Sequence, residues 1–289
     1  MTALEQAAPG GYHGGVAPAI SVEEVARQAQ ALAREVGIDE LDALAGHEPH
    51  LRIDNLHAGY GQMEILHGLN LRVGRQQSLC LIGPNGAGKS TVLHSIFGFT
   101  DIYSGSICTE RGGKPMDVTR TSSNEKLRSS GIAYILQDKS VFPGMTVEEN
   151  LWMGGYLMPH TMEAKLAAEK VFDRYPRLAA RRKHPAKVLS GGERRLLEIS
   201  RALVMDPQIL LVDEPSIGLE PRFIDAVFEI LADLQHKEGK TIVIVEQNAK
   251  KGLEFADIGY VLVSGKLALA GRADDLLANA DVSRLFLGG

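Results

Sequence analysis

The segment GPNGAGKST, residues 83–91, constrains this chain more than any other, because it matches the phosphate-loop pattern G-x-x-x-x-G-K-[ST]. It follows the apolar run QQSLCLIG, residues 76–83, and precedes a run with helical periodicity. Glycines allow backbone N–H groups to converge on phosphate oxygens without a Cβ in the way. The segment therefore predicts a strand, a phosphate-binding loop and a helix in that order, as in an α/β fold.

This loop supplies the candidate nucleotide-binding residues. Lys89 can reach the β- and γ-phosphates, and the hydroxyl of Ser90 can bind Mg²⁺. The amino terminus of the following helix adds its partial positive charge. The residues that we expect to contact the nucleotide are Gly83, Pro84, Asn85, Gly86, Ala87, Gly88, Lys89, Ser90 and Thr91.

A second feature is ILLVDEP, residues 209–215. Its apolar residues predict a buried strand, and Asp213 then lies at the carboxyl end, where ligands bind in parallel sheets. We expect Asp213 to hold Mg²⁺, directly or through water. Glu214 is the candidate general base for an attacking water, a role that contributes about 10²–10⁴ in rate.

Strand-like runs alternate with helical patterns beyond residue 50, which predicts parallel βαβ units. The strands are expected at residues 131–136, 208–213 and 241–246. Residues from about 139 to 189 are helical in pattern, so we expect a helical insertion there. Within this region Thr146 and Glu149 have capping-box spacing, and the segment LSGGE then opens a further helix, since Ser190 and Glu193 have the same spacing. Taken alone, that segment indicates a well-capped helix whose first turn could also receive an anion.

Residues 1–49 differ from the remainder of the chain. They carry eight acidic and two basic residues, a charge of 2 − 8 = −6, against −5 for the whole chain. We expect disorder over the first twenty residues, which are rich in Gly, Ala and Pro, and a helix over residues 21–36. We interpret residues 1–49 as a poorly attached extension, with a docking helix as the alternative. Deleting them should leave nucleotide binding nearly unchanged.

Composition excludes several classes of protein. A balance of 31 basic and 36 acidic residues argues against a non-specific DNA-coating protein. Two cysteines make no disulfide framework, and neither a signal peptide nor an 18-residue apolar run is apparent. We therefore expect a soluble cytoplasmic protein that could dock on a membrane protein. His47 and His50 are interpreted as solvated loop histidines rather than metal ligands.

Four features follow one another along residues 51–289: the phosphate loop, the segment LSGGE, the apolar strand ending in DEP and a switch position after the strand expected at residues 241–246. Their order resembles that of ATP-binding-cassette (ABC) ATPases. The resemblance implies an α/β fold: a P-loop ABC ATPase domain over residues 50–289, with a parallel-sheet core, a helical subdomain insertion and N-terminal antiparallel strands. It also implies that the subunit binds ATP and Mg²⁺ and hydrolyses ATP.

The same resemblance implies further site residues. Tyr60 stands where the family stacks an aromatic ring on adenine, and a tyrosine at a strand edge is the alternative interpretation. Gln137 stands at the glutamine that senses Mg²⁺ and the attacking water and links to the transmembrane partner. The residues implied to touch the γ-phosphate held by the opposite subunit are Ser190, Gly191 and Gly192.

Gln247 occupies the position of the family's switch histidine. Glutamine can donate a hydrogen bond to a γ-phosphate but carries no positive charge. The second of the two ATP-binding subunits in bacterial branched-chain amino acid importers also carries glutamine there, and several segments resemble it. Subunits of urea and short-amide importers are very similar. The pair Gln137-Asp138 departs from the glutamate-glycine pair of the amino-acid type.

The leading hypothesis is therefore the energy-coupling ATPase of an importer, peripheral at the cytoplasmic face of the bacterial inner membrane. Implied partners are a second ATPase subunit, two transmembrane permease subunits and, indirectly, an extracytoplasmic substrate-binding protein, with no nucleic acid. Gln247 favours a heterodimer with unequal sites, and a homodimer remains the alternative. A soluble ABC ATPase should show two cassettes or long coiled coils, and an exporter ATPase should keep the switch histidine. The transported substrate is not encoded in this subunit.

Overall fold

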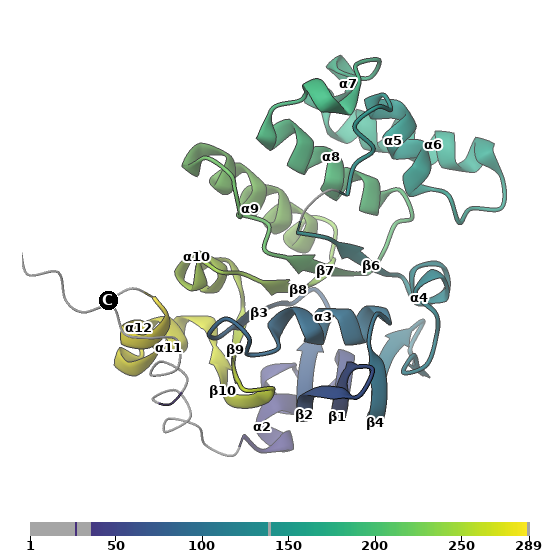
Figure 1. The fold of residues 1–289 in the computed structure, drawn as a ribbon. Coiled ribbons are helices and arrows are strands. Elements are labelled where there is room, and N and C mark those ends of the chain that lie inside the picture. The colour runs from purple at the N-terminus through teal and green to yellow at the C-terminus, as the bar shows by residue number, and fades with distance from the viewer. Residues whose placement is uncertain (1–26, 28–35, 138–139, 288–289) are drawn as a thin grey trace, which may run out of the picture.

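The computed structural model describes residues 27, 36–137 and 140–287 (Figure 1). The strands are β1 (Pro49–Tyr60), β2 (Met63–Gly74), β3 (Ser78–Ile82), β4 (Asp101–Arg111), β5 (Lys114–Asp117), β6 (Ile132–Ile135), β7 (Ile209–Asp213), β8 (Thr241–Val245), β9 (Ile258–Val263) and β10 (Lys266–Arg272). The helices are α2 (Ile38–Leu44), α3 (Lys89–Phe97), α4 (Ser123–Ser130), α5 (Val147–Gly154), α6 (Thr161–Arg174), α7 (Pro176–Ala180), α8 (Gly191–Leu203), α9 (Pro221–His236), α10 (Ala249–Phe255), α11 (Ala273–Ala278) and α12 (Ala280–Phe286).

The larger sheet has the strand order β10-β9-β3-β8-β7-β6. Neighbouring strands from β9 to β6 pair in parallel, and only β10 joins antiparallel. Strands β3, β7 and β8 are buried at every position, as expected for a parallel sheet covered on both faces. Each strand predicted from an apolar run is present within two residues of its expected ends. The expected parallel-sheet core is therefore confirmed.

The smaller sheet has the order β2-β1-β4-β5 and is antiparallel throughout. This confirms the N-terminal antiparallel strands that the resemblance implied. Helix α3 packs between the two sheets, because its apolar residues Val92, Leu93 and Ile96 belong to the same core cluster as residues of β1, β2, β3 and β8. The helix that follows the phosphate loop is thus fixed on two sides (Figure 1).

Helices α5, α6, α7 and α8 form a layer of their own at one end of the molecule (Figure 1). A separate apolar cluster, which includes Leu151, Phe172 and Leu197, holds this layer together. Capping boxes at Thr146 and Ser190 start α5 and α8, as their spacing to a glutamate predicted. Between β6 and α8 the described residues contain helices and turns and no strand, which agrees with the helical pattern of this region.

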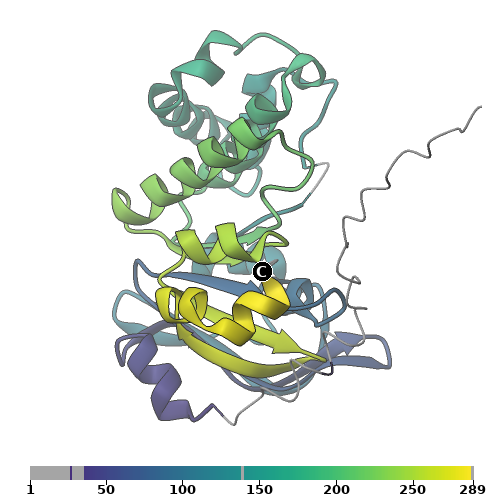
Figure 2. The same ribbon diagram turned by 90° about the vertical axis from the view of Figure 1, so that its left-hand side faces the viewer.

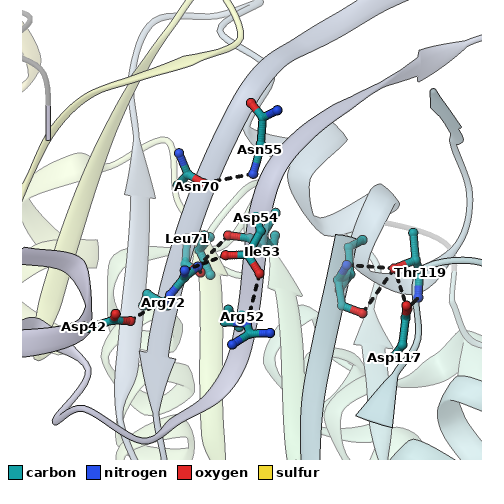
Figure 3. A network of polar contacts seen from close by, with 11 residues as sticks. Asp42, Arg52, Ile53, Asp54, Asn55, Asn70, Leu71, Arg72, Asp117 and Thr119 are labelled. Carbon is teal, nitrogen blue, oxygen red and sulfur yellow. Dashed lines mark hydrogen bonds and ion pairs between the residues drawn. The ribbon is translucent and has the colours of Figure 1, made fainter. Parts of the chain in front are cut away.

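Helix α2 differs from the poorly attached extension that we expected. Leu41 is 0% exposed in the main core, and the buried guanidinium of Arg72 in β2 donates from Nε to Asp42 over 2.8 Å. Arg72 also bonds Asp54 of β1 over 2.5 Å and the carbonyl of Ile53 over 2.6 Å (Figure 3). An apolar side chain and a partly buried ion pair therefore attach α2 to the antiparallel sheet. The helix expected over residues 21–36 lies almost entirely outside the described residues, as does the segment 1–20.

Figure 2 shows α2 at the end of the molecule opposite the helical layer.

The interpretation of His50 as a solvated histidine is wrong. It is buried, and its Nδ1 lies 2.8 Å from the hydroxyl of Thr241, while desolvation by burial lowers its pKa to about 4. Nothing among the helices of the described residues has both the length and the apolar character needed to cross a bilayer.

Candidate functional site

The loop between β3 and α3 depends on glycine at several positions. Gly83, Gly86 and Gly88 have φ values of 148°, 81° and 96°, a region that L side chains rarely adopt. A Cβ at Gly83 would lie 2.2 Å from the carbonyl oxygen of Leu262 in β9. Since the first amides of a helix have no acceptor within it, the start of α3 leaves N–H groups free to meet an anion.

Lys89 is folded back over this loop. Its Nζ donates to the carbonyl oxygens of Gly83 over 2.9 Å and Pro84 over 3.1 Å. Desolvation by burial lowers the pKa of Lys89, and the nearby carboxylates of Glu214 and Asp213 oppose that shift. The ammonium group therefore lies inside the loop, between its carbonyls and two acidic residues.

Asp213 ends β7 with only 5% of its surface exposed. Its two carboxylate oxygens have different partners: the hydroxyl of Ser90 donates to Oδ1 over 3.2 Å, and the hydroxyl of Tyr134 donates to Oδ2 over 2.7 Å. Burial and the charge of Asp213 both raise the pKa of Tyr134, which keeps that hydroxyl protonated and able to donate. The structure thus brings Ser90 and Asp213 together, as the sequence predicted for metal ligands.

This donor set fits Mg²⁺. Mg²⁺ takes oxygen ligands and is usually held by one or two carboxylates, waters and the phosphates of a substrate. A carboxylate and a hydroxyl beside a phosphate-binding loop meet that description. In the part of the chain that the structure describes, no cluster of three or more His, Cys, Asp or Glu residues forms an alternative metal site.

Glu214 follows directly and has φ 43°, in the left-handed region. Its N–H donates to the carbonyl of Val245 over 2.8 Å, which fixes the turn after β7 against β8. Nε2 of Gln137 donates to Oε2 of Glu214 over 2.9 Å. Desolvation by burial raises the pKa of Glu214, and the charge of Asp213 raises it further, whereas Lys89 lowers it. A carboxylate with a raised pKa beside a phosphate loop has the properties of a general base.

Tyr60 lies at the end of β1 and is 43% exposed. Its hydroxyl and Nδ1 of His94 in α3 share a hydrogen bond of 2.5 Å, and the two rings meet edge to face. A cavity of about 410 Å³ joins this tyrosine to the phosphate loop. Its lining residues are Tyr60, Ile65, Asn85, Gly86, Gly88, Lys89, Ser90, Thr91 and Glu214.

The remaining predicted site residues do not line this cavity. Ser190, Gly191 and Gly192 form the start of α8, where the hydroxyl of Ser190 accepts from the N–H of Glu193 over 3.2 Å. Gln247 is exposed after β8, and its side chain forms no hydrogen bond with any described residue. None of these four residues lines the cavity beside the chain's own phosphate loop.

Sequence reasoning missed Tyr134, His94 and Arg195. Arg195 of α8 is 4% exposed, and its Nη1 donates to the carbonyl of Leu136 over 2.8 Å and to that of Gln137 over 3.4 Å. Its Nη2 lies 3.4 Å from the carbonyl of Asp213. In the sequence, Tyr134 is visible only as a tyrosine inside an apolar strand and Arg195 only as an arginine on the buried face of α8. Neither pattern shows which residue the side chain hydrogen-bonds.

A strand, a glycine-rich loop and a helix, with an acidic residue at the end of a nearby parallel strand, define a P-loop nucleotide-binding domain. The sequence model of the ABC transporter family matches residues 66–217. The chain belongs to this family and is one of its ATPases.

The relatives cover most of the chain. The high-affinity branched-chain amino acid transport ATP-binding protein BraG of Pseudomonas aeruginosa is 39% identical over 83% of this chain and 100% of its own length. The probable branched-chain amino acid transport ATP-binding protein LivF of Archaeoglobus fulgidus is 37% identical over 82% of this chain and 98% of its own. A solved structure of the ADP conformation of an ATP-binding cassette of an ABC transporter has a TM-score of 0.71 at 28% identity, covering 83% and 99%.

Proposed function

We propose that this chain is the ATP-hydrolysing subunit of an importer for branched-chain amino acids. The observation that carries the ATPase role is the shared cavity, which brings Lys89, Ser90 and Glu214 together with the predicted base-stacking residue Tyr60. The importer assignment rests on the similarity to BraG over that protein's whole length and on Gln247 at the switch position. A urea or short-amide importer is the alternative.

The chemistry follows from the side chains of one chain. The loop amides and Lys89 bind the phosphates, while Ser90 and Asp213 hold Mg²⁺, which neutralises charge on the phosphate oxygens. Glu214 accepts the proton of the attacking water, and its raised pKa brings its basicity closer to neutral pH. Gln137, bonded to Glu214, orients that water or the carboxylate itself.

The site is completed by a second subunit. Since Ser190, Gly191 and Gly192 lie away from the chain's own phosphate loop, we propose that they contact ATP bound by a partner cassette. Gln247 provides a neutral donor at the switch position. A partner with histidine at that position would make a heterodimer with two unequal sites.

A groove lined in part by β6, the strand that precedes Gln137, supports docking on membrane subunits. It has a volume of about 280 Å³ and lies between β6 and helices α5 and α8. Phe142, Met153 and Tyr156 line it, and all three are large exposed apolar side chains. Exposed apolar surface of this kind marks protein-interaction sites. We propose that a permease subunit binds here, which would place the chain at the cytoplasmic face of the inner membrane.

Reconstitution tests this proposal. The chain is assembled in vesicles with the permeases, second cassette and binding protein encoded beside its gene, and uptake of radiolabelled leucine, urea and acetamide is measured. We expect ATP-dependent leucine uptake that Glu214→Gln abolishes or strongly reduces. Uptake of urea or acetamide instead would overturn the amino-acid assignment and leave the ATPase assignment intact.

A further inference from the structure

Tyr134 lies inside β6, outside every motif used above. Strand β6 pairs in parallel with β7, where Tyr134 faces Leu211 in register. The tyrosine side chain therefore reaches forward along β7 to the residue at its end. Its hydroxyl donates to Oδ2 of Asp213 over 2.7 Å, although the two residues are 79 positions apart in the sequence.

Neighbouring rings fix the direction of this hydroxyl. The Tyr134 ring has centroid distances of 5.6 Å to Phe97, 5.8 Å to Phe99 and 5.7 Å to His94, all from the end of α3 or just beyond it. The contacts with Phe99 and His94 are edge to face, the arrangement that aromatic pairs favour. Packing against α3 thus orients the donor before any nucleotide is bound.

The two oxygens of Asp213 consequently face two different groups. Oδ1 faces the hydroxyl of Ser90 beside the phosphate loop, and Oδ2 is held by Tyr134. We propose that Tyr134 is a positioning residue that holds Oδ2, so that Oδ1 remains directed at the Mg²⁺ bound with ATP. This inference rests on the proposed function, because it assumes that Asp213 serves the metal.

Removal of the hydroxyl has a defined physical effect. A buried carboxylate that loses a donor satisfies itself by turning toward the remaining donors, and hydrogen bonds to charged groups are among the stronger ones. Asp213 would then rotate toward Ser90 and compete with the metal for that hydroxyl. The loss should fall on Mg²⁺-dependent binding, since Tyr134 does not line the nucleotide cavity.

The test is Tyr134→Phe, which keeps the ring and removes only the hydroxyl. ATP affinity is measured by calorimetry on the full chain, once with Mg²⁺ and once with EDTA. We expect the variant to match the wild type in EDTA and to bind Mg²⁺-ATP about 10-fold more weakly, the size of one charge-assisted hydrogen bond. Electron paramagnetic resonance of Mn²⁺ in the ATP complex should show the same weakening without turnover.

Tyr260→Phe is the matched control. Tyr260 is fully buried, and its hydroxyl donates to the carbonyl of Arg72 far from Asp213, so this variant loses a buried tyrosine hydroxyl elsewhere. Its Mg²⁺ dependence should equal that of the wild type. Phe99→Leu provides a second variant. Phe99 is half-exposed and its ring packs against that of Tyr134, so the substitution loosens the Tyr134 ring. It should weaken ATP binding with Mg²⁺ and leave ATP binding in EDTA unchanged.

Three results would overturn the inference. Unchanged Mg²⁺-ATP affinity in both Tyr134→Phe and Phe99→Leu removes the positioning role. Equal weakening with and without Mg²⁺ makes the hydroxyl a support of the fold alone. A wild-type chain that gains no affinity from Mg²⁺ rejects the metal assignment in the proposed function, and with it this inference, whereas either of the first two results, obtained with a wild type that does gain affinity from Mg²⁺, rejects the inference alone.

Discussion

Gln137 donates a hydrogen bond from Nε2 to Oε2 of Glu214 over 2.9 Å, and thereby joins two segments 77 residues apart. Gln137 lies two residues after the end of β6, whose residues line the groove proposed for the permease, and Glu214 lines the cavity at the phosphate loop. A displacement of the segment after β6 therefore changes a contact of the candidate base directly. In the proposed function, this hydrogen bond therefore links the candidate base to the segment next to the proposed docking groove.

Glu214→Gln should leave ATP binding intact and lower turnover by about 10²–10⁴, because it removes the base and keeps the shape of the side chain. Phosphate release from the assembled transporter measures turnover, and calorimetry measures binding. Glu220→Gln is the control, since Glu220 lies in the same segment and its carboxylate pairs with the exposed Arg222. Normal hydrolysis by Glu214→Gln with a normal Glu220→Gln would reject the assignment.

The raised pKa of Glu214 predicts a dependence of stability on pH. Its ionised form is disfavoured in the folded state, so the stability contribution is fully present below the ordinary pKa of a glutamate, about 4.3, and is lost as the pH rises through the folded-state pKa. Glu214→Gln should therefore unfold at a higher temperature than the wild type at pH 7. The difference should shrink toward pH 4 in thermal unfolding scans, and a difference independent of pH would contradict this reasoning.

Tyr60→Ala should weaken ATP binding by about 1–3 kcal/mol, the usual contribution of a base stacked on an aromatic ring. Inorganic tripolyphosphate, which has no base, should bind both proteins equally, and Tyr60→Phe should retain most of the affinity for ATP. Calorimetry compares the ligands, with Tyr156→Ala as the control because that side chain is 76% exposed outside the nucleotide cavity. An equal loss of affinity for ATP and for tripolyphosphate would show that Tyr60 does not stack on the base and is only a residue at a strand edge.

Leu41→Ala should lower the free energy of unfolding by about 2–5 kcal/mol, because the side chain is fully buried in the main core. Ile38→Ala on the exposed side of α2 is the control and should change little.

The structure also revises the expectation for truncation. Deletion of residues 1–49 should destabilise the cassette through loss of α2. Urea denaturation of the wild type and the three variants separates these outcomes.

The chain purified alone should hydrolyse ATP slowly, because the start of α8 does not meet its own phosphate loop and Gln247 lacks a positive charge. Phosphate release should rise when a second cassette with a switch histidine and the membrane subunits are added. Gln247→His should raise the activity of the complex further. A homodimer of the isolated chain that hydrolyses ATP as fast as the complex would refute the proposed heterodimer with two unequal sites.

The sequence predicts those elements of the structure that depend only on residues close together in the chain. The apolar runs predicted β3, β6, β7 and β8, and side-chain spacing predicted the capping boxes at Thr146 and Ser190. Helix α2 escaped prediction because seven residues give too little periodicity, and what holds it is the distant Arg72. The hydrogen bond between Tyr134 and Asp213 escaped for a related reason, since it depends on the register of β6 against β7.

Arg195 binds the carbonyls of Leu136, Gln137 and Asp213 from the first turns of α8. The same helix begins with the Ser-Gly-Gly turn that we propose to serve a partner's nucleotide. A tilt of α8 must therefore carry those three carbonyls with it or break their hydrogen bonds. If a partner cassette contacts the start of α8, as we propose, the guanidinium of Arg195 therefore passes a movement of that helix directly to the backbone of Asp213, the proposed metal ligand.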